Sequence, residues 1–269
     1  MSIIYFKKIF FLSVFFSLVI FFSSCNNEKT KIEKKDVHFN YTVLNRFLNR
    51  YVADGKVKYE EIKNDKALDP YIEQVKNFEP YAIDDANERL AFWINAYNAF
   101  TIKLISDYYP VESILDIESK TGMNPWSINF IEMAEGRKFT LDEIEKKIIL
   151  KKYKDPRIHY VLVCAAESCP VIIPKAYTSD ELNNLLDDQA KIFLNDNNKN
   201  SINKENKTLE LSIIYKWYKR DFIEKDSSVI EHLKKYISDD DRAFITKNNI
   251  QEIEYLDYSW KLNDYKKSE

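Results

Sequence analysis

The densest group of chemically reactive side chains lies between residues 157 and 170. This segment reads RIHYVLVCAAESCP and holds His159, Cys164 and Cys169. A cysteine acts as a nucleophile in its thiolate form, and histidine is the usual base that removes the proton. The segment therefore predicts a cysteine-dependent hydrolase or acyl transferase that acts on a peptide-like substrate.

The positions of the two cysteines favour Cys169 as the nucleophile and His159 as its base. If the segment is extended, His159 and Cys164 lie about 16 Å apart on opposite faces of a strand. Cys164 ends an apolar run and is expected to pack like a small hydrophobic residue. Cys169 precedes Pro170, which favours an extended backbone and an outward-pointing sulfur.

The same cysteines have a second interpretation, in which Cys164 and Cys169 form a local disulfide. An exported compartment permits this bond, which would remove the free thiol and favour a non-catalytic binding or scaffold protein. Zinc is not favoured, because His-x₄-Cys-x₄-Cys lacks the paired short spacings of structural zinc sites. We expect no metal and no cofactor, and both interpretations of the cysteines stay open.

Two further residues are candidates for orienting the His159 imidazole, namely Asn98 and Glu143. Asn98 shares one face of an apolar helical segment with Asn95, and buried amides most often bond to backbone groups, so a structural role is the alternative. Glu143 closes a Thr-x-x-Glu capping box that would occupy its side chain. Glu145 is interpreted as a solvent-facing residue beside two lysines.

The composition excludes several classes of function. The chain has only three glycines, at positions 55, 122 and 136, which lie too far apart to form a phosphate-binding loop. The chain has 40 Lys and Arg residues and 43 Asp and Glu residues, so its formal net charge is −3. No strongly basic patch is evident, so we expect no nucleic-acid partner.

The N-terminus has the order of a lipoprotein signal peptide. Lys7 and Lys8 precede an apolar run over 9–22, and two serines then precede Cys25. We expect residues 1–24 to be removed and Cys25 to be lipidated. This places the protein in the bacterial cell envelope, at the outer membrane, with its membrane as one partner and a peptide-like substrate or a protein as the other.

The rest of the chain is expected to form a flexible tether over 25–37 and a single domain over 38–269. Apolar spacing predicts helices over 44–51, 69–78, 85–109, 140–152 and 178–195, and places His232 on a surface helix. A Val-rich run over 158–164 predicts a buried strand, with weaker strands over 128–133, 208–213 and 253–258 and a polar loop over 195–206. This is a predominantly helical α+β domain around a small sheet.

Four blocks of sequence carry a resemblance to a known family. They are WINAYNAFTI at 93–102, FTLDEIE at 139–145, DPRIH with CAAESCP at 155–170, and YSWKLN at 258–263. From about residue 90 to 263, the chain resembles the domain of unknown function 547. The resemblance implies a fold related to papain-like thiol hydrolases and transglutaminases, with base and nucleophile in the third block. Family members often have histidine after Ile-Glu in the second block, where this chain has Lys146.

Overall fold

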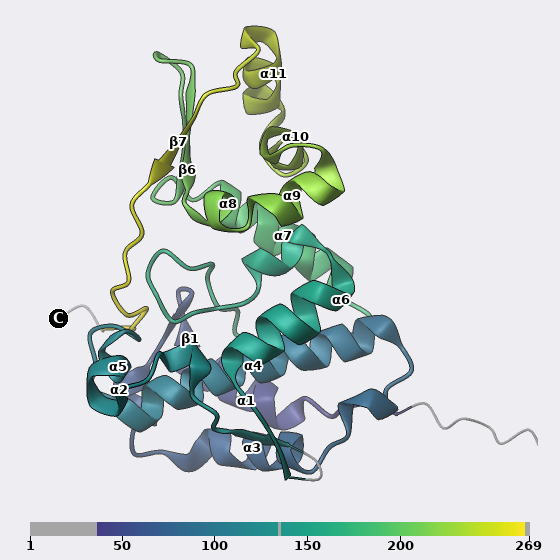
Figure 1. Ribbon diagram of the computed structural model, residues 1–269, viewed down its shortest axis with the longest axis vertical. Helices are drawn as coiled ribbons and strands as arrows, with labels where there is room; N and C mark the ends of the chain where they lie inside the picture. Colours follow the sequence, from purple (N-terminus) through teal and green to yellow (C-terminus); the bar gives the residue numbers. More distant parts are fainter. Residues whose placement is uncertain (1–36, 134–135, 267–269) are drawn as a thin grey trace, which may run out of the picture. The chain divides into compact units, whose positions relative to one another are not determined.

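The computed structural model describes residues 37–133 and 136–266 (Figure 1). The described residues belong to one compact unit, Asp36–Glu269. The predicted signal peptide, Cys25 and the tether up to residue 36 lie outside them. Helices predominate and the sheets are small, which confirms the predicted α+β class.

Most of the described helices are short. In chain order the α-helices are α1 Thr42–Tyr51, α2 Tyr59–Ile62, α3 Asp69–Lys76, α4 Ala86–Tyr108, α5 Asp116–Thr121, α6 Lys151–Tyr153, α7 Leu182–Leu194, α8 Ile214–Trp217, α9 Lys219–Asp226, α10 Val229–Leu233 and α11 Asp239–Asn248. Single 3₁₀ turns are found at Lys66–Leu68, Pro80–Ala82, Pro125–Ser127 and Pro156–Tyr160, and a π-helical segment at Glu143–Leu150.

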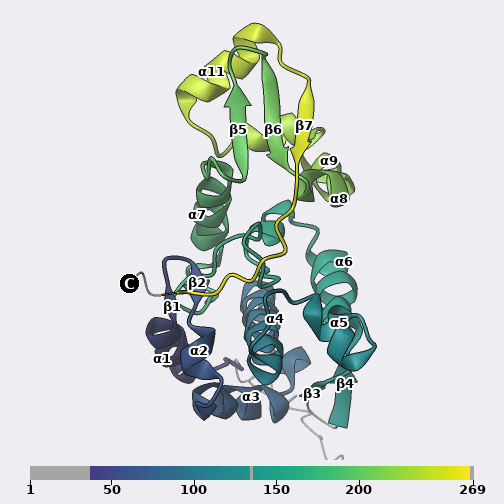
Figure 2. The same cartoon turned by 90° about the vertical axis from the view of Figure 1, so that its left-hand side faces the viewer.

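The described strands form two hairpins and one three-stranded sheet. They are β1 Val52–Ala53, β2 Lys56–Val57, β3 Ile131–Met133, β4 Arg137–Phe139, β5 Asn200–Asn203, β6 Thr208–Ser212 and β7 Ile253–Leu256. In the larger sheet β6 is central, antiparallel to β5 and parallel to β7 (Figure 2). The weaker predicted strands contain β3, β6 and β7, whereas β5 lies where a polar loop was predicted. That loop pairs because Asn200 bonds through its side chain to the carbonyl of Phe193 and the amide of Ser212.

Helix α4 lies within the helix predicted over 85–109, and it is the central helix of the first hydrophobic cluster. Asp85 caps it by accepting a 2.7 Å hydrogen bond from the amide of Glu88. The Glu88 carboxylate does not return to the cap but accepts from the amide of Phe39 instead. Every residue from 90 to 102 is buried, so the helix is surrounded by the rest of the domain rather than lying on its surface.

The second hydrophobic cluster forms around β6, α7 and α10, and the ring of His232 packs against its members Tyr160 and Phe222. The prediction that His232 lies on a surface helix is wrong, because its side chain is fully buried. Its Nε2 lies 2.8 Å from the Tyr160 hydroxyl and its Nδ1 lies 2.5 Å from Oδ2 of Asp226. These partners satisfy the ring inside the core, which the short polar segment around His232 does not reveal from sequence alone.

The predicted strand over 158–164 is also wrong. Pro156 starts a 3₁₀ helix, and Asp155 caps it by accepting from the amide of Arg157. The following backbone bonds to a side chain instead of a neighbouring strand. Asn98 donates to the carbonyl of Val161 at 2.8 Å and accepts from the amide of Val163 at 2.9 Å. An amide side chain thus takes the place of a strand neighbour, so the Val-rich run is buried without sheet pairing.

The starts of the helices predicted over 140–152 and 178–195 differ in their capping. The box before the π-helical segment is confirmed in both directions, since Thr140 and Glu143 each bond to the other's backbone amide. No capping box forms at the start of the second helix. Helix α7 begins at Leu182 without a side-chain cap, and the Ser179 hydroxyl donates to Asp85 at 2.9 Å.

The segment after β7 runs back along the domain and joins parts that are distant in sequence (Figure 2). Its backbone pairs with the cysteine loop, where the amides of Glu167 and Asn263 bond to the carbonyls of Lys261 and Ala165. It also bonds to β2, through the amide of Val57 and the carbonyl of Asn263. Among the described residues, no helix has the length and apolar character needed to cross a membrane.

Candidate functional site

A cavity of about 340 Å³ lies beside the cysteine loop. Its walls come from α4, the π-helical segment, the 3₁₀ helix before the cysteines, α8 and the C-terminal segment. The lining residues are Tyr97, Asn124, Trp126, Asp142, Glu145, Lys146, His159, Leu162, Cys164, Cys169, Pro170, Ile214, Trp217, Tyr218, Tyr258 and Trp260. We refer to this cavity as the aromatic pocket, because six of these side chains are Trp or Tyr.

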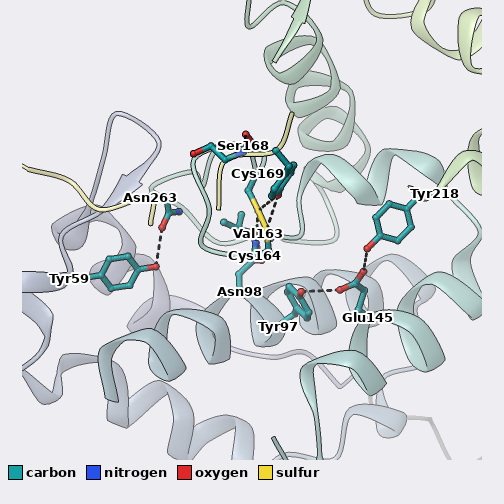
Figure 3. The surroundings of a disulfide bond; sticks show 12 residues. Tyr59, Tyr97, Asn98, Glu145, Val163, Cys164, Ser168, Cys169, Tyr218 and Asn263 are labelled. Atoms are coloured by element: carbon teal, nitrogen blue, oxygen red, sulfur yellow. Dashed lines mark hydrogen bonds between the residues drawn. A yellow bond between two sulfur atoms is a disulfide. The ribbon is translucent and has the colours of Figure 1, made fainter. Parts of the chain in front are cut away.

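Cys164 and Cys169 are joined by a disulfide on the wall of the aromatic pocket (Figure 3). Their Cα atoms are 6.1 Å apart, within the usual range for a disulfide. The amide of Cys164 donates to the Cys169 sulfur at 3.0 Å, and the Tyr258 hydroxyl lies 3.1 Å from each sulfur. The sequence left open whether these cysteines are a free nucleophile or a disulfide, and the structure contains the disulfide.

The exposure of the two cysteines is the reverse of the prediction. Cys169 is buried, whereas Cys164 is half-buried. The reason is that the C-terminal segment covers the loop, with Ala166 forming a bridge to Leu262 and the amide of Ser259 bonding to the Ser168 hydroxyl. Cys164 is therefore the more exposed residue of the two.

The turn between β1 and β2 packs directly against the end of the cysteine loop. Gly55 has φ +72°, and a Cβ at this position would come within 2.7 Å of the Val171 side chain. Its carbonyl accepts a hydrogen bond from the amide of Ile172. Glycine is therefore required here both for the backbone conformation and for the close approach.

His159 lines the aromatic pocket together with both sulfurs, and its ring is firmly positioned. Its Nε2 lies 2.9 Å from Oδ2 of Asp221 on α9, and its ring packs on that of Tyr218 with centroids 4.1 Å apart. The hydrogen bond from His159 holds the pKa of Asp221 below its ordinary value, against the opposing effect of burial. The approach of Cys169 to His159 as nucleophile and base stays a prediction.

The other two predicted site residues, Asn98 and Glu143, are not among the residues that line the pocket. Asn98 holds the backbone at Val161 and Val163, and Asn95 does the same at Tyr177, where it bonds to both the carbonyl and the amide. Glu143 caps its helix and bonds to Lys147 at 3.0 Å. The observed contacts of these side chains are structural.

Glu145 is a pocket residue that the sequence analysis missed. It is only 7% exposed, and it lies between two tyrosines (Figure 3). The hydroxyls of Tyr97 and Tyr218 donate to its two carboxylate oxygens at 2.9 Å and 2.8 Å. Burial raises the pKa of both tyrosines, and the carboxylate adds to that rise. Both phenols therefore stay protonated and available as donors.

The spacing of the apolar residues around Glu145 explains its burial. Leu141, four residues before it, is buried, as are Ile144 and Ile149 in the π-helical segment. Residues four apart lie on the same face of a helix, so Glu145 shares the buried face of Leu141. This spacing is a sequence signal for the burial of Glu145, although the next two residues are exposed lysines.

Four aromatic side chains form one side of the pocket. The ring of Trp260 contacts those of Trp126, Trp217 and Tyr258, with centroids 5.6, 6.1 and 4.6 Å away. Trp217 is 48% exposed, although it is a large apolar residue. These rings come from three segments that are far apart in sequence, and their faces give the pocket a rigid apolar surface.

Some charged side chains around the pocket have partners of opposite charge among the described residues, and one does not. Lys146 forms an ion pair with Asp142 at 2.7 Å, and His159 contacts Asp221. No ion pair in the described part of the chain includes Glu145. Nor do the described residues contain a group of three or more His, Cys, Asp or Glu side chains arranged to hold a metal ion.

Residues 83–194 match the family described as "Protein of unknown function, DUF547". The matched region starts just before α4, includes Glu145, His159 and the disulfide, and ends at the last residue of α7. The match supports a relationship between this chain and the DUF547 family. No curated protein and no solved structure gave a match. The relationship to papain-like hydrolases and transglutaminases therefore stays a prediction.

Proposed function

We propose that this protein is an exported ligand-binding protein, and that the aromatic pocket is its binding site. The observation that carries the proposal is the Cys164–Cys169 disulfide, which occupies both sulfurs that a thiol enzyme would need. The disulfide fixes the loop that forms one wall of the pocket. A cavity lined mainly by aromatic and other apolar side chains, with a few polar groups, is the usual form of a small-molecule site.

The half-exposed Trp217 provides a second argument for binding. Large apolar side chains that remain exposed beside a cavity often contact a ligand. Trp217 packs on Tyr258 and Trp260, so its position is fixed before a ligand arrives. A pre-formed aromatic wall reduces the conformational entropy lost on binding.

The oxidation state of the cysteines is the first test. The full-length protein is denatured without reductant and treated with iodoacetamide, and the peptides are then analysed by mass spectrometry. We expect Cys164 and Cys169 to be unmodified before reduction and alkylated after it. Alkylation of Cys169 without reductant would contradict the binding proposal and favour the thiol enzyme.

Binding itself can be tested with indole, a neutral aromatic probe, by saturation-transfer NMR. We expect saturable binding to the full-length protein, weakened roughly threefold to tenfold in Trp217→Ala, because one aromatic contact is lost. The matched control is Tyr81→Ala, since Tyr81 is 49% exposed and does not line the pocket. Equal weakening by both variants, or no saturable binding, would overturn the proposal.

A thiol enzyme is the second candidate, favoured by the presence of His159 and both sulfurs in one pocket. An external dithiol would first give two electrons and two protons to the disulfide. The Cys169 thiol would then lose its proton to His159 and attack an acyl carbon. A thioester would form, and the leaving amine or alcohol would take the proton. Hydrolysis of nitrophenyl acetate only by the reduced protein, and its loss in Cys169→Ser, would support this candidate.

We further propose that lipidated Cys25 anchors the protein in the bacterial cell envelope, at the outer membrane. The support is the order of charge, apolar run and small residues before Cys25. A peptide-like compound or a protein partner would then meet the pocket outside the cytoplasm.

A further inference from the structure

We infer that the aromatic pocket binds an organic ammonium ion, with Glu145 as its counter-charge. This inference rests on the proposed binding function and names the chemical class of the ligand. It depends on three features of the pocket: a buried carboxylate without a cationic partner, a set of aromatic rings, and the positions of the neighbouring charges.

The first feature is the environment of the Glu145 carboxylate. The side chain is more than nine-tenths buried, and its two oxygens accept hydrogen bonds only from neutral tyrosine hydroxyls in the described part of the chain. A buried carboxylate is normally paired with a cation, because loss of hydration is costly. Glu145 lines the cavity, so a positively charged ligand can reach the position of the missing partner.

The second feature is the aromatic wall formed by Trp126, Trp217, Tyr258 and Trp260. The face of an aromatic ring carries partial negative charge and attracts a cation, most strongly when the ring is that of tryptophan. Several rings around one cavity can replace the hydration shell of an alkylated ammonium group, which is itself weakly hydrated. Burial raises the pKa of Tyr258, so this ring stays neutral and contributes no opposing or additional charge.

The third feature is that the basic side chains near Glu145 already have carboxylate partners. Lys146 follows Glu145 in sequence, yet its Nζ bonds to Asp142 at 2.7 Å. His159 is held by Asp221 at 2.9 Å. Lys146 is balanced by Asp142, and a second carboxylate, that of Asp221, faces the His159 ring, so the carboxylate of Glu145 gives the pocket a net negative charge. A neutral or anionic ligand would leave that charge uncompensated.

The inference is tested with two probes of nearly equal shape, choline and its neutral isostere dimethylbutanol, in which carbon replaces the quaternary nitrogen. Their affinities for the full-length protein are measured by saturation-transfer NMR. We expect choline to bind at least about tenfold more tightly than dimethylbutanol, as cation–aromatic attraction and a buried counter-charge both favour it.

Two variants then assign the preference to one carboxylate. Glu145→Gln keeps the size of the side chain and removes its charge, so the preference for choline should disappear. Glu118→Gln on the exposed surface of α5 removes the same charge elsewhere and should keep the preference. A melting curve for each variant establishes that it is folded, and the comparison of the two probes on the unmodified protein needs no variant.

Each other outcome overturns the inference in a distinguishable way. Equal affinity for the two probes, or a preference that survives in Glu145→Gln, would exclude Glu145 as the counter-charge of a bound cation. Binding of indole without binding of choline would also overturn the inference, while the proposed binding function would stand. If none of the three probes bound, both the inference and the proposed function would be wrong.

Discussion

Nε2 of His159 lies 2.9 Å from Oδ2 of Asp221, and this contact joins the 3₁₀ helix before the cysteine loop to α9. The imidazole is buried, whereas the carboxylate is at the edge of the solvent. The pair therefore fixes the orientation of His159 at the wall of the aromatic pocket, whether the pocket binds a ligand or supports thiol chemistry.

The first prediction concerns the acid stability that this pair provides. The hydrogen bond from His159 lowers the folded-state pKa of Asp221 below its ordinary value of 3.8. The stabilisation is thus present above about pH 3.8 and is lost as the pH falls through the lower folded-state value. Asp221→Asn should lower the Tm at neutral pH and show a smaller loss of Tm below pH 3.8. The exposed control Asp188→Asn should follow the unmodified protein, and an unchanged acid profile in Asp221→Asn would contradict the prediction.

The second prediction concerns the Asn98 side chain, which replaces a strand neighbour for the backbone at Val161 and Val163. Asn98→Leu leaves one buried carbonyl and one buried amide without partners. We expect it to lower the free energy of unfolding by about 1–3 kcal/mol for each group. Chemical denaturation measures this change. Asn77→Leu is the control, because Asn77 is exposed and bonds only to Glu73. A stable Asn98→Leu protein that fails to bind indole would instead assign Asn98 to the binding site.

The third prediction concerns His232. Burial lowers its folded-state pKa, against the opposing effect of Asp226, while Lys235 and Tyr160 also face the ring. Because the folded value lies below the ordinary 6.5, the unfolded state takes up the proton first as the pH falls. Stability should therefore decrease below about pH 6.5, and His232→Gln should reduce that decrease. The measurement is the Tm between pH 7 and pH 5. An identical slope in the variant would show that another group is responsible.

The fourth prediction concerns the N-terminal anchor, which lies outside the described residues. Cells are grown with labelled palmitate, and the protein is isolated from both the membrane and the soluble fractions. Cys25→Ala should lose the label and either leave the membrane or accumulate as an unprocessed precursor. A Cys164→Ser/Cys169→Ser variant should be labelled like the unmodified protein. Equal labelling of Cys25→Ala would rule out lipidation at this residue.

Local sequence determined much of the helical framework. The reciprocal box of Thr140 with Glu143 depends on residues three apart, so their residue types were sufficient to predict it. The apolar spacing also identified α1, α3 and α7, because one buried face repeats within each helix. The reactive segment with His159, Cys164 and Cys169 was evident from its composition alone.

Only the tertiary structure decided what those residues contact. The Asn98 side chain on α4 bonds to the backbone that follows His159, so the segment predicted as a strand is irregular. Tyr97 and Tyr218 bond to Glu145 from distant segments, and the Tyr258 hydroxyl lies beside two sulfurs that are about ninety residues away in sequence. These contacts depend on the packing of distant segments rather than on local periodicity. For that reason, sequence could identify the reactive residues, whereas the bonding of the cysteines and the charge of the pocket required the fold.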